Sequence, residues 1–305
     1  MAAPSPSFRR IAFGRGFLVQ LRAAAVVLRA SDDGRELAIV PIAAHAAVPL
    51  PFGSVLVVGA AGSYRFDPGR REPVELPHIS LLPGSELHPS RESAEHVWVV
   101  EPALRQVLRY TLAPDAGLGL ERQLSFATHD GRAFTTLLDG SFLFTTSDGL
   151  ARTAPGGAPR RLAWPENLGA PWRLLAGDHV GRAWVANAAG DLVLVELAAR
   201  ARVVRTVSTG LRPFDFAATR STLALVSVEE SAERRFSLDV YTSAGSHRFR
   251  VALPVARAGG EPDWFARIAA DQQVALTEDP PRVAVGGPGR LSLFDSNTGA
   301  ARFSE

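Results

Sequence analysis

The chain has 305 residues, of which 46% are hydrophobic and none is cysteine, so disulfides, a thiolate nucleophile and a cysteine-ligated zinc site are excluded. All 33 basic residues are arginines, and 31 acidic residues reduce the net charge to +2. The arginines are scattered, whereas a nucleic-acid footprint needs basic residues clustered near stacking aromatics, so this composition disfavours nucleic-acid binding. No apolar run reaches the roughly 18 residues of a membrane-spanning helix, and we expect no membrane partner.

The N-terminal segment places basic residues ahead of an apolar stretch, as secretory signals do. Arg15 and Arg22 interrupt that stretch, and residues 17–31 fit two strands better than one apolar segment. We therefore expect a cytoplasmic protein in which residues 1–16 are either flexible or part of a ring closure.

Three strands are predicted next, at residues 17–21, 24–30 and 35–42, with Asp32-Asp33-Gly34 as the turn between the last two. They predict a first repeat that is three-stranded or irregular. An open edge strand promotes aggregation, so a ring of sheets has to close. The predicted closure pairs residues 8–13 with a fourth strand at the C-terminus.

Six more regular repeats follow, and their third strands are the clearest markers. These strands align at Tyr64, Leu108, Leu150, Leu192, Leu238 and Leu291. The steps between them run from 42 to 53 residues, which is the spacing of four-stranded propeller blades. The last and longest step leaves room for an extra strand near residues 274–276.

The repeat at residues 181–226 shows the pattern of one blade. Residues 191–197 are apolar on both faces, as a strand between stacked sheets must be. Arg202 and Arg205 then interrupt a run of valines, which indicates a half-exposed outer strand. The sequence predicts an all-β fold with residues 1–305 as a single β-propeller of four-stranded antiparallel blades, seven in number, with six or eight left open.

The stretch AWVANAAGDLVLVELAARARVVRTVSTGLRPFDFAAT resembles the YVTN-type repeat of bacterial propellers. LFDSNTG, at residues 293–299, is similar to the end of a WD40 repeat, with Phe294 where that family prefers Trp and Asp295 in the Asp position. Together these matches cover about a third of the chain. The resemblance implies a propeller and does not specify a function.

Motifs that carry catalysis are missing from the sequence. No two of the seven histidines have metal-ligand spacing, and neither a Gly-x-Ser-x-Gly elbow nor a phosphate-binding Walker loop occurs. We predict no catalytic residue, no metal ligand and no cofactor.

A binding site is instead sought where the first strand of each blade begins. In propellers of this kind, that end faces the side on which ligands usually bind, and an aromatic residue or histidine recurs at each predicted entry. The candidate binding residues there are His78, Phe134, Trp172, Arg173, Phe214, Asp215, Asp263 and Trp264. Their side chains either plug the central channel or form a binding ring.

Three functions are compatible with these features. The preferred one is a non-catalytic scaffold for protein–protein interaction in a larger assembly, in which the polar insertions 229–235, with Glu230 and Arg234, and 256–263 meet the partner. The alternative is a channel-mouth hydrolase similar to lactonase propellers, where Asp215 and Asp263 would hold a divalent cation. The third is nucleic-acid binding through arginine.

Overall fold

The computed structural model describes most of the chain, in two compact units. The described residues are 11–69, 72–82, 85–91, 93, 95–101, 104–113, 117–125, 133–146, 149–153, 157–162, 174–177, 181–187, 190–198, 201–228, 236–253, 272–286 and 290–305. The first unit combines Met1–Ser125 with Val255–Glu305, and the second is Phe126–Pro254.

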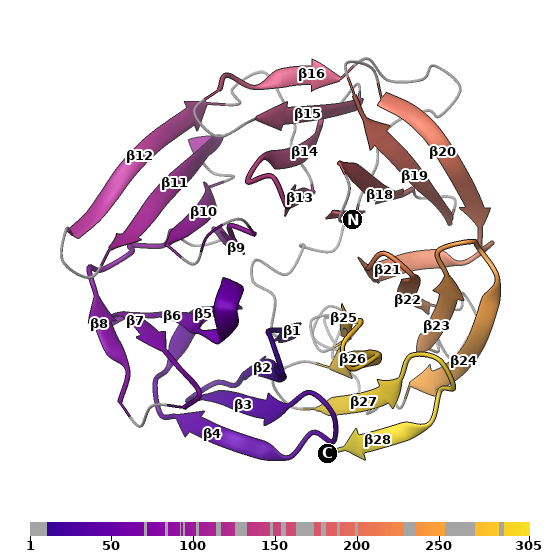
Figure 1. The fold of residues 1–305 in the computed structure, drawn as a ribbon, viewed down its shortest axis with the longest axis horizontal. Coiled ribbons are helices and arrows are strands. Elements are labelled where there is room, and N and C mark those ends of the chain that lie inside the picture. Colours follow the sequence, from indigo (N-terminus) through magenta and orange to yellow (C-terminus); the bar gives the residue numbers. More distant parts are fainter. Residues whose placement is uncertain are drawn as a thin grey trace, which may run out of the picture. The chain divides into compact units, whose positions relative to one another are not determined.

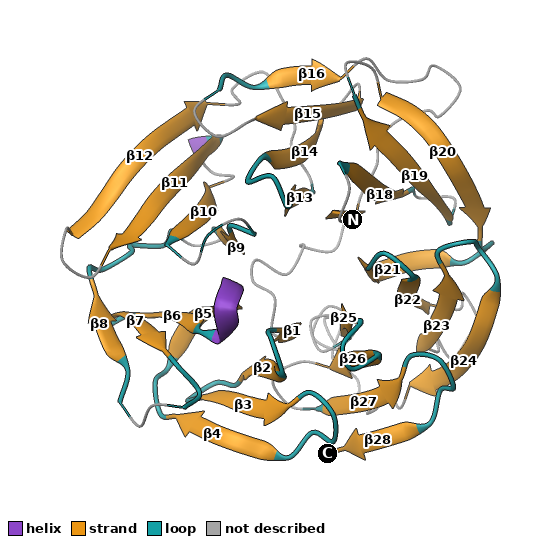
Figure 2. Ribbon diagram, in the orientation of Figure 1, coloured by secondary structure: helices purple, strands orange, loops and turns teal. Residues whose placement is uncertain are grey.

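Seven four-stranded antiparallel sheets make up the described fold, and each is built from four strands consecutive in sequence. Strands account for nearly all of the regular structure in the described residues, where helix is limited to short 3-10 turns such as Pro51–Gly53 (Figure 2). The predicted all-β architecture of seven four-stranded blades is thus confirmed.

The first unit holds four of the sheets (Figure 1). The first sheet comprises β1 (Ile11–Phe13), β2 (Phe17–Leu21), β3 (Val26–Ala30) and β4 (Glu36–Val40). The second comprises β5 (Ala44–Pro49), β6 (Val55–Gly59), β7 (Gly62–Phe66) and β8 (Val74–Leu76). The third comprises β9 (Glu86–Pro89), β10 (His96–Glu101), β11 (Gln106–Ala113) and β12 (Gly117–Ser125). The last in sequence comprises β25 (Gln273–Thr277), β26 (Arg282–Gly286), β27 (Leu291–Asp295) and β28 (Ala301–Ser304).

The second unit holds the remaining three sheets. One comprises β13 (Phe134–Thr136), β14 (Phe142–Thr146), β15 (Gly149–Thr153) and β16 (Arg160–Leu162). The next comprises β17 (Leu174–Gly177), β18 (Arg182–Ala186), β19 (Asp191–Leu197) and β20 (Ala201–Ser208). The third comprises β21 (Arg212–Ala218), β22 (Thr222–Val228), β23 (Phe236–Thr242) and β24 (His247–Leu253).

The middle strands form because their residues are apolar on both faces. In β6, Val55 and Val57 pack in a cluster with the first sheet, while Leu56 and Val58 pack in a cluster with the third. Successive side chains of a strand point to opposite faces, so one Val-Leu-Val-Val run supplies two separate cores. All five residues of β6 are buried.

The outer strands carry the charge. In β20, Ala201 and Val207 are buried, whereas Arg202 and Arg205 are exposed, as the sequence predicted for a half-solvated fourth strand. The six predicted third strands are β7, β11, β15, β19, β23 and β27. The predicted third strand of each of these six repeats is therefore confirmed.

The first sheet differs from the prediction. It has four strands, because β1 pairs with β2 through Ile11↔Gln20, Ala12↔Val19 and Phe13↔Leu18. Residues 11–13 therefore do not pair beside the C-terminal strand as expected, and residues 8–10 lie outside the described residues. The last sheet is complete without them, since residues 274–276, predicted as an extra strand, belong to its first strand, β25.

Side chains, rather than a shared sheet, join the first and last sheets. Arg29 is 5% exposed and donates to the carboxylate of Glu305 at 2.6 Å and to the carbonyl of Gly34 at 3.1 Å. Its guanidinium also lies 4.8 Å from the ring centroid of Phe303 on β28. Arg22 donates to the other carboxylate oxygen of Glu305 at 2.5 Å. A charged, partly buried contact thus connects two neighbouring sheets of the first unit.

Replacing Trp184 by Ala tests the packing between sheets. Trp184, on β18, is 1% exposed and packs with Phe216 and Leu225 of the next sheet. The substitution should lower the free energy of unfolding by about 3–5 kcal/mol, because it leaves a large cavity. Chemical denaturation measures the change. Val204→Ala, at an exposed position of β20, should change it by less than about 0.5 kcal/mol.

Candidate functional site

Four of the ten predicted binding residues lie in the described part of the chain. They are His78, Phe134, Phe214 and Asp215. The other predicted residues lie outside the described residues: Trp172, Arg173, Glu230, Arg234, Asp263 and Trp264.

His78 does not begin a first strand, contrary to the prediction. It is exposed in the connection after β8, and the first strand of the next sheet, β9, begins only at Glu86. The neighbouring Ile79 is buried, and its N–H donates to Ser63 Oγ at 2.8 Å. The connection therefore contacts β7 before β9 begins, which the dipeptide Pro77-His78 did not indicate. The last sheet begins with β25 at Gln273, and the predicted entry at 262–264 lies outside the described residues.

Phe134 begins β13, as predicted, and takes part in an aromatic cluster. It is 8% exposed, and its ring stacks on those of Phe142 at 5.9 Å and Phe144 at 6.4 Å between centroids. Phe142 and Phe144 lie on β14, two residues apart and so on one face of the sheet. The three rings bury each other, which makes Phe134 a packing residue of its own sheet.

Phe214 and Asp215 lie next to each other on β21, at a β-bulge. The register with β22 shifts between Pro213 and Asp215, so the ladder resumes with Asp215↔Val226. Phe214 is half-buried, and its ring meets that of Phe236 edge to face at 5.8 Å. A bulge redirects the side chains beside it. Asp215 is half-buried too, so of the two acidic residues predicted for a cation, one is partly accessible and Asp263 is outside the described residues.

A buried polar network in the same sheet was not predicted. Asp239, on β23, is fully buried and accepts hydrogen bonds from Ser237 Oγ at 3.1 Å and Arg250 Nε at 2.8 Å, with His247 Nε2 at 3.1 Å. Ser227 Oγ lies 2.9 Å from Ser237 Oγ. The signal in the sequence was the alternation of Ser237 and Asp239 on one face of an otherwise apolar strand.

The contacts of this network differ from those of a catalytic triad and hold strands together. In a catalytic triad the histidine stands between the nucleophilic serine and the carboxylate. Here Ser237 and His247 both contact the carboxylate of Asp239. The network links the three strands β22, β23 and β24, because Asp239 pairs in register with Arg250 and Ser237 with Ser227.

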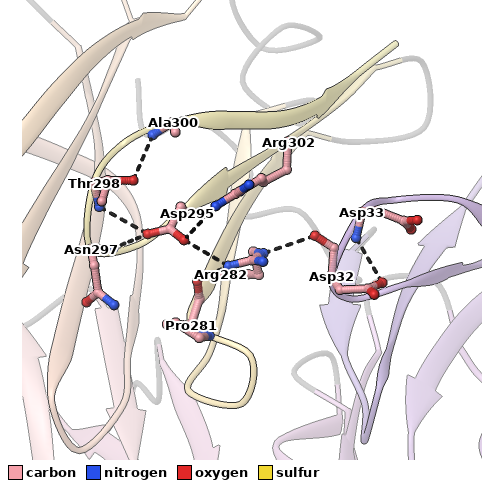
Figure 3. Close-up of polar contacts among 9 residues, drawn as sticks. All are labelled: Asp32, Asp33, Pro281, Arg282, Asp295, Asn297, Thr298, Ala300 and Arg302. Atoms are coloured by element: carbon pink, nitrogen blue, oxygen red, sulfur yellow. Dashed lines mark hydrogen bonds and ion pairs between the residues drawn. The ribbon is translucent and has the colours of Figure 1, made fainter.

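A second network surrounds Asp295 at the end of β27 (Figure 3). Its Oδ1 accepts from the backbone N–H groups of Asn297 at 3.0 Å and Thr298 at 3.1 Å. Its Oδ2 accepts from Arg282 at 3.0 Å and Arg302 at 3.3 Å. Arg282 also donates through Nε to the carbonyl of Asp32 at 3.1 Å, in the β3–β4 turn of the neighbouring sheet. The aspartate at the WD40-like position therefore closes its own turn and helps to join two sheets.

The connection 229–235 links β22 to β23, and its own residues lie outside the described part of the chain. These strands already pair over seven residues without a register shift, from Thr222↔Thr242 to Val228↔Phe236. The corresponding connection in the preceding sheet spans only residues 187–190, where Asn187 accepts from the N–H of Asp191 at 2.8 Å. The connection between second and third strands is therefore longer in this sheet than in the preceding one.

Among the described residues, no group of three or more His, Asp or Glu side chains could hold a metal ion. Within the same residues, no helix has the length and apolarity needed to span a bilayer.

No protein-family model and no curated protein matches the chain. Among solved structures, Kluyveromyces lactis Hsv2 is similar with a TM-score of 0.59 and 9% identity, over 95% of this chain and 90% of that one. A version of Hsv2 whose loop 6CD is replaced by a Gly-Ser linker gives a TM-score of 0.62 at 10% identity, over 95% and 89% of the two chains. Saccharomyces cerevisiae Sqt1 gives 0.52 at 12% identity, over 82% and 81%.

The fold is a seven-bladed β-propeller. Identities of 9–12% show the fold alone. What this propeller does has to be argued from its own residues.

Two carboxylates in the first unit make the stability pH-dependent. Burial alone would raise the pKa of Glu305, but the hydrogen bond from Arg22 and the charge of Arg29 outweigh it, so the pKa lies below its ordinary value of 4.5. Burial would likewise raise the pKa of Asp295, but the N–H groups of Asn297 and Thr298 and the guanidinium of Arg302 hold it below 3.8. Such groups stabilise the fold above their unfolded pKa, and the contribution is lost as the pH falls through the folded pKa.

The free energy of unfolding should accordingly decline as the pH falls below about 4.5. Glu305→Gln should lower it by about 1–3 kcal/mol at neutral pH, because Arg29 loses its charged acceptor. The difference from the unmodified protein should shrink at acid pH, which denaturation at a series of pH values measures. Glu36→Gln, at an exposed position of β4, is the control. An equal effect of both variants would contradict the role of Glu305.

Proposed function

We propose that this protein is a non-catalytic β-propeller scaffold that mediates protein–protein interaction within a larger assembly. The observation that carries the proposal is the length of the connection 229–235, which exceeds that of its counterpart at 187–190 and lies between two strands that pair without a register shift. A longer loop costs closure entropy and builds no core, so a use outside folding explains its presence. Glu230 and Arg234 in this connection are the proposed polar contacts with the partner.

The connection between β24 and β25 supports the same proposal. β24 ends at Leu253 and β25 begins at Gln273, whereas the corresponding connection after β20 spans only residues 209–211. Trp264 and Asp263 fall within the longer connection, and Trp172 and Arg173 directly precede β17. Tryptophan is enriched among the residues that dominate interface energies, so Trp172 and Trp264 are proposed as separate anchors.

The buried aspartates whose contacts are described form hydrogen bonds that hold strands and turns together. Asp239 is held by Ser237, His247 and Arg250, and Asp295 by Arg282 and Arg302. These carboxylates are engaged in holding strands and turns together. This use of charge supports a framework role for the sheets, with contact residues on the connections. The YVTN-like repeat pattern and a cytoplasmic location are part of the same proposal.

Partner binding tests the two connections independently. Replacing residues 230–234 by a short Gly-Ser turn, or changing Trp264 to Ala, should each weaken binding of a co-purified partner by at least about tenfold, since each removes a proposed contact. Isothermal titration with the purified partner measures the dissociation constant. The melting temperature should stay unchanged.

Arg202→Ala, on the outer strand β20, is the matched control and should leave binding intact. A partner that binds all three variants as tightly as the unmodified protein would rule out these connections as its contact surface.

Removing metal ions distinguishes the scaffold from a hydrolase with a channel-mouth cation. A metal that binds only the folded state raises the melting temperature, so its removal lowers that temperature. We expect the melting temperature to be the same with and without a chelator, and unchanged by added calcium or zinc. A rise of many degrees with either ion, or lactone hydrolysis that is lost in Asp215→Ala, would favour the hydrolase.

A further inference from the structure

Phe52 is the most exposed large hydrophobic residue in the part of the chain that the structure describes. Its exposed fraction is 78%, against 56% for Leu104, the next highest. It lies in the Pro51–Gly53 turn that joins β5 to β6, the first and second strands of their sheet. Burial therefore contributes little to keeping a phenyl ring at this position.

The backbone of Phe52 is also unfavourable for a large side chain. Its φ is 69° and its ψ is 9°, in the left-handed region. For a bulky residue this conformation is a genuine outlier, and glycine or asparagine adopts it far more readily. Gly53, which follows, has a φ of 98°. Folding alone would thus favour a different residue at position 52.

The turn that carries Phe52 is firmly held at its base. The N–H of Leu50 donates to the carbonyl of Ser54 at 2.8 Å, and these two residues are 3% and 7% exposed. Pro51 restricts the backbone between them. The ring is therefore presented to solvent by an ordered turn, and little conformational entropy is lost when a partner binds it.

We propose that Phe52 is an anchor residue that inserts into an apolar pocket of a partner protein. Strained residues cluster at sites of function because the surrounding structure has to maintain them, and exposed aromatics are typical anchors of interfaces. The inference rests on the proposed scaffold role, but it concerns a turn between first and second strands. The connection 229–235, by contrast, joins second and third strands.

A protein pocket fits this ring better than a lipid bilayer. Among the described first-to-second and third-to-fourth strand turns of the first unit, Phe52 is the only large exposed hydrophobic residue. Membrane-binding surfaces use an extended apolar face, whereas a single ring fills a single pocket. A phenyl ring buries only about 150–250 Å², and a stable interface buries about 1,200 Å² or more in total. The partner must therefore also contact neighbouring turns of this unit, such as 14–16 with the exposed Arg15.

The first experiment locates the partner. A photo-crosslinking phenylalanine analogue is placed at position 52, and separately at position 104, in full-length protein expressed in its native cells. Leu104 is the matched control because it is exposed, belongs to the same unit and lies beside Arg105, whose φ is 50°. We expect an adduct with one protein from position 52 and none with that protein from position 104. No adduct, the same adduct from both positions, or an adduct with a second copy of this chain would overturn the proposal.

The second experiment measures affinity and stability with the purified partner. Phe52→Ala and Phe52→Asn should each weaken binding at least about tenfold, while Leu104→Ala leaves it unchanged. Phe52→Asn should keep or raise the melting temperature, because asparagine suits the left-handed backbone. A melting temperature lowered by several degrees in both Phe52 variants would make Phe52 a folding residue and overturn the proposal.

Two further arms separate the remaining outcomes. Binding to vesicles of phosphatidylcholine and phosphatidylserine that is lost in Phe52→Ala would replace the protein pocket by a bilayer. Trp264→Ala and the 230–234 replacement are assayed against the same partner. If these two variants weaken binding and Phe52→Ala does not, the inference on Phe52 fails and the proposed contact surface at 230–234 and Trp264 is supported. If only Phe52→Ala weakens binding, the inference on Phe52 is supported and that contact surface is ruled out.

Discussion

The packing of sheets face to face is the constraint on which the rest of this structure depends. A strand in the middle of such a sheet is covered on both sides, so consecutive residues have to be apolar although they point in opposite directions. β18 shows this directly, since Ala183 and Val185 belong to one core cluster and Trp184 and Ala186 to another. The sheet that contains β18 is thus stabilised by two neighbours, and the loss of one large side chain there affects a contact between sheets.

Polar groups within the inner strands need partners inside the sheet, because this packing excludes water from them. Two charges that lie deep in the sheets, those of Asp239 and Arg29, have several partners, because an unpaired buried charge is strongly destabilising. Asp239 is fully buried with Ser237, His247 and Arg250 around it, and Arg29 is nearly buried with Glu305, Gly34 and Phe303. These networks fix the register of strands and join neighbouring sheets. The buried charged residues Asp239 and Arg29 therefore have structural roles.

Residues that the fold does not require are accordingly the best guide to function. The ladder between β22 and β23 runs from Thr222↔Thr242 to Val228↔Phe236 without a register shift, and the connection 229–235 follows it. In the β5–β6 turn, the left-handed backbone of Phe52 is unfavourable for a side chain as large as a phenyl ring. A longer connection costs closure entropy, and a left-handed backbone at a bulky residue costs conformational energy. In the scaffold that we propose, such positions provide specificity and the sheets hold them in place.

The sequence by itself determined the class of fold and the identity of most strands, because the period-two pattern and the repeat length are local properties. The repeat spacing predicts third strands at Tyr64, Leu108 and Leu192, and each one is a third strand in the structure. Tertiary structure alone decided where the first strands β9 and β25 begin, since long connections precede them and His78 lies in one of these. It also decided the partners of Ile11–Phe13, because a short strand can pair at several edges and only packing selects β2. The exposure and the left-handed backbone of Phe52 were likewise beyond the sequence, since Pro-Phe-Gly reads as an ordinary turn and only the closed β5–β6 hairpin sets the φ of its central residue.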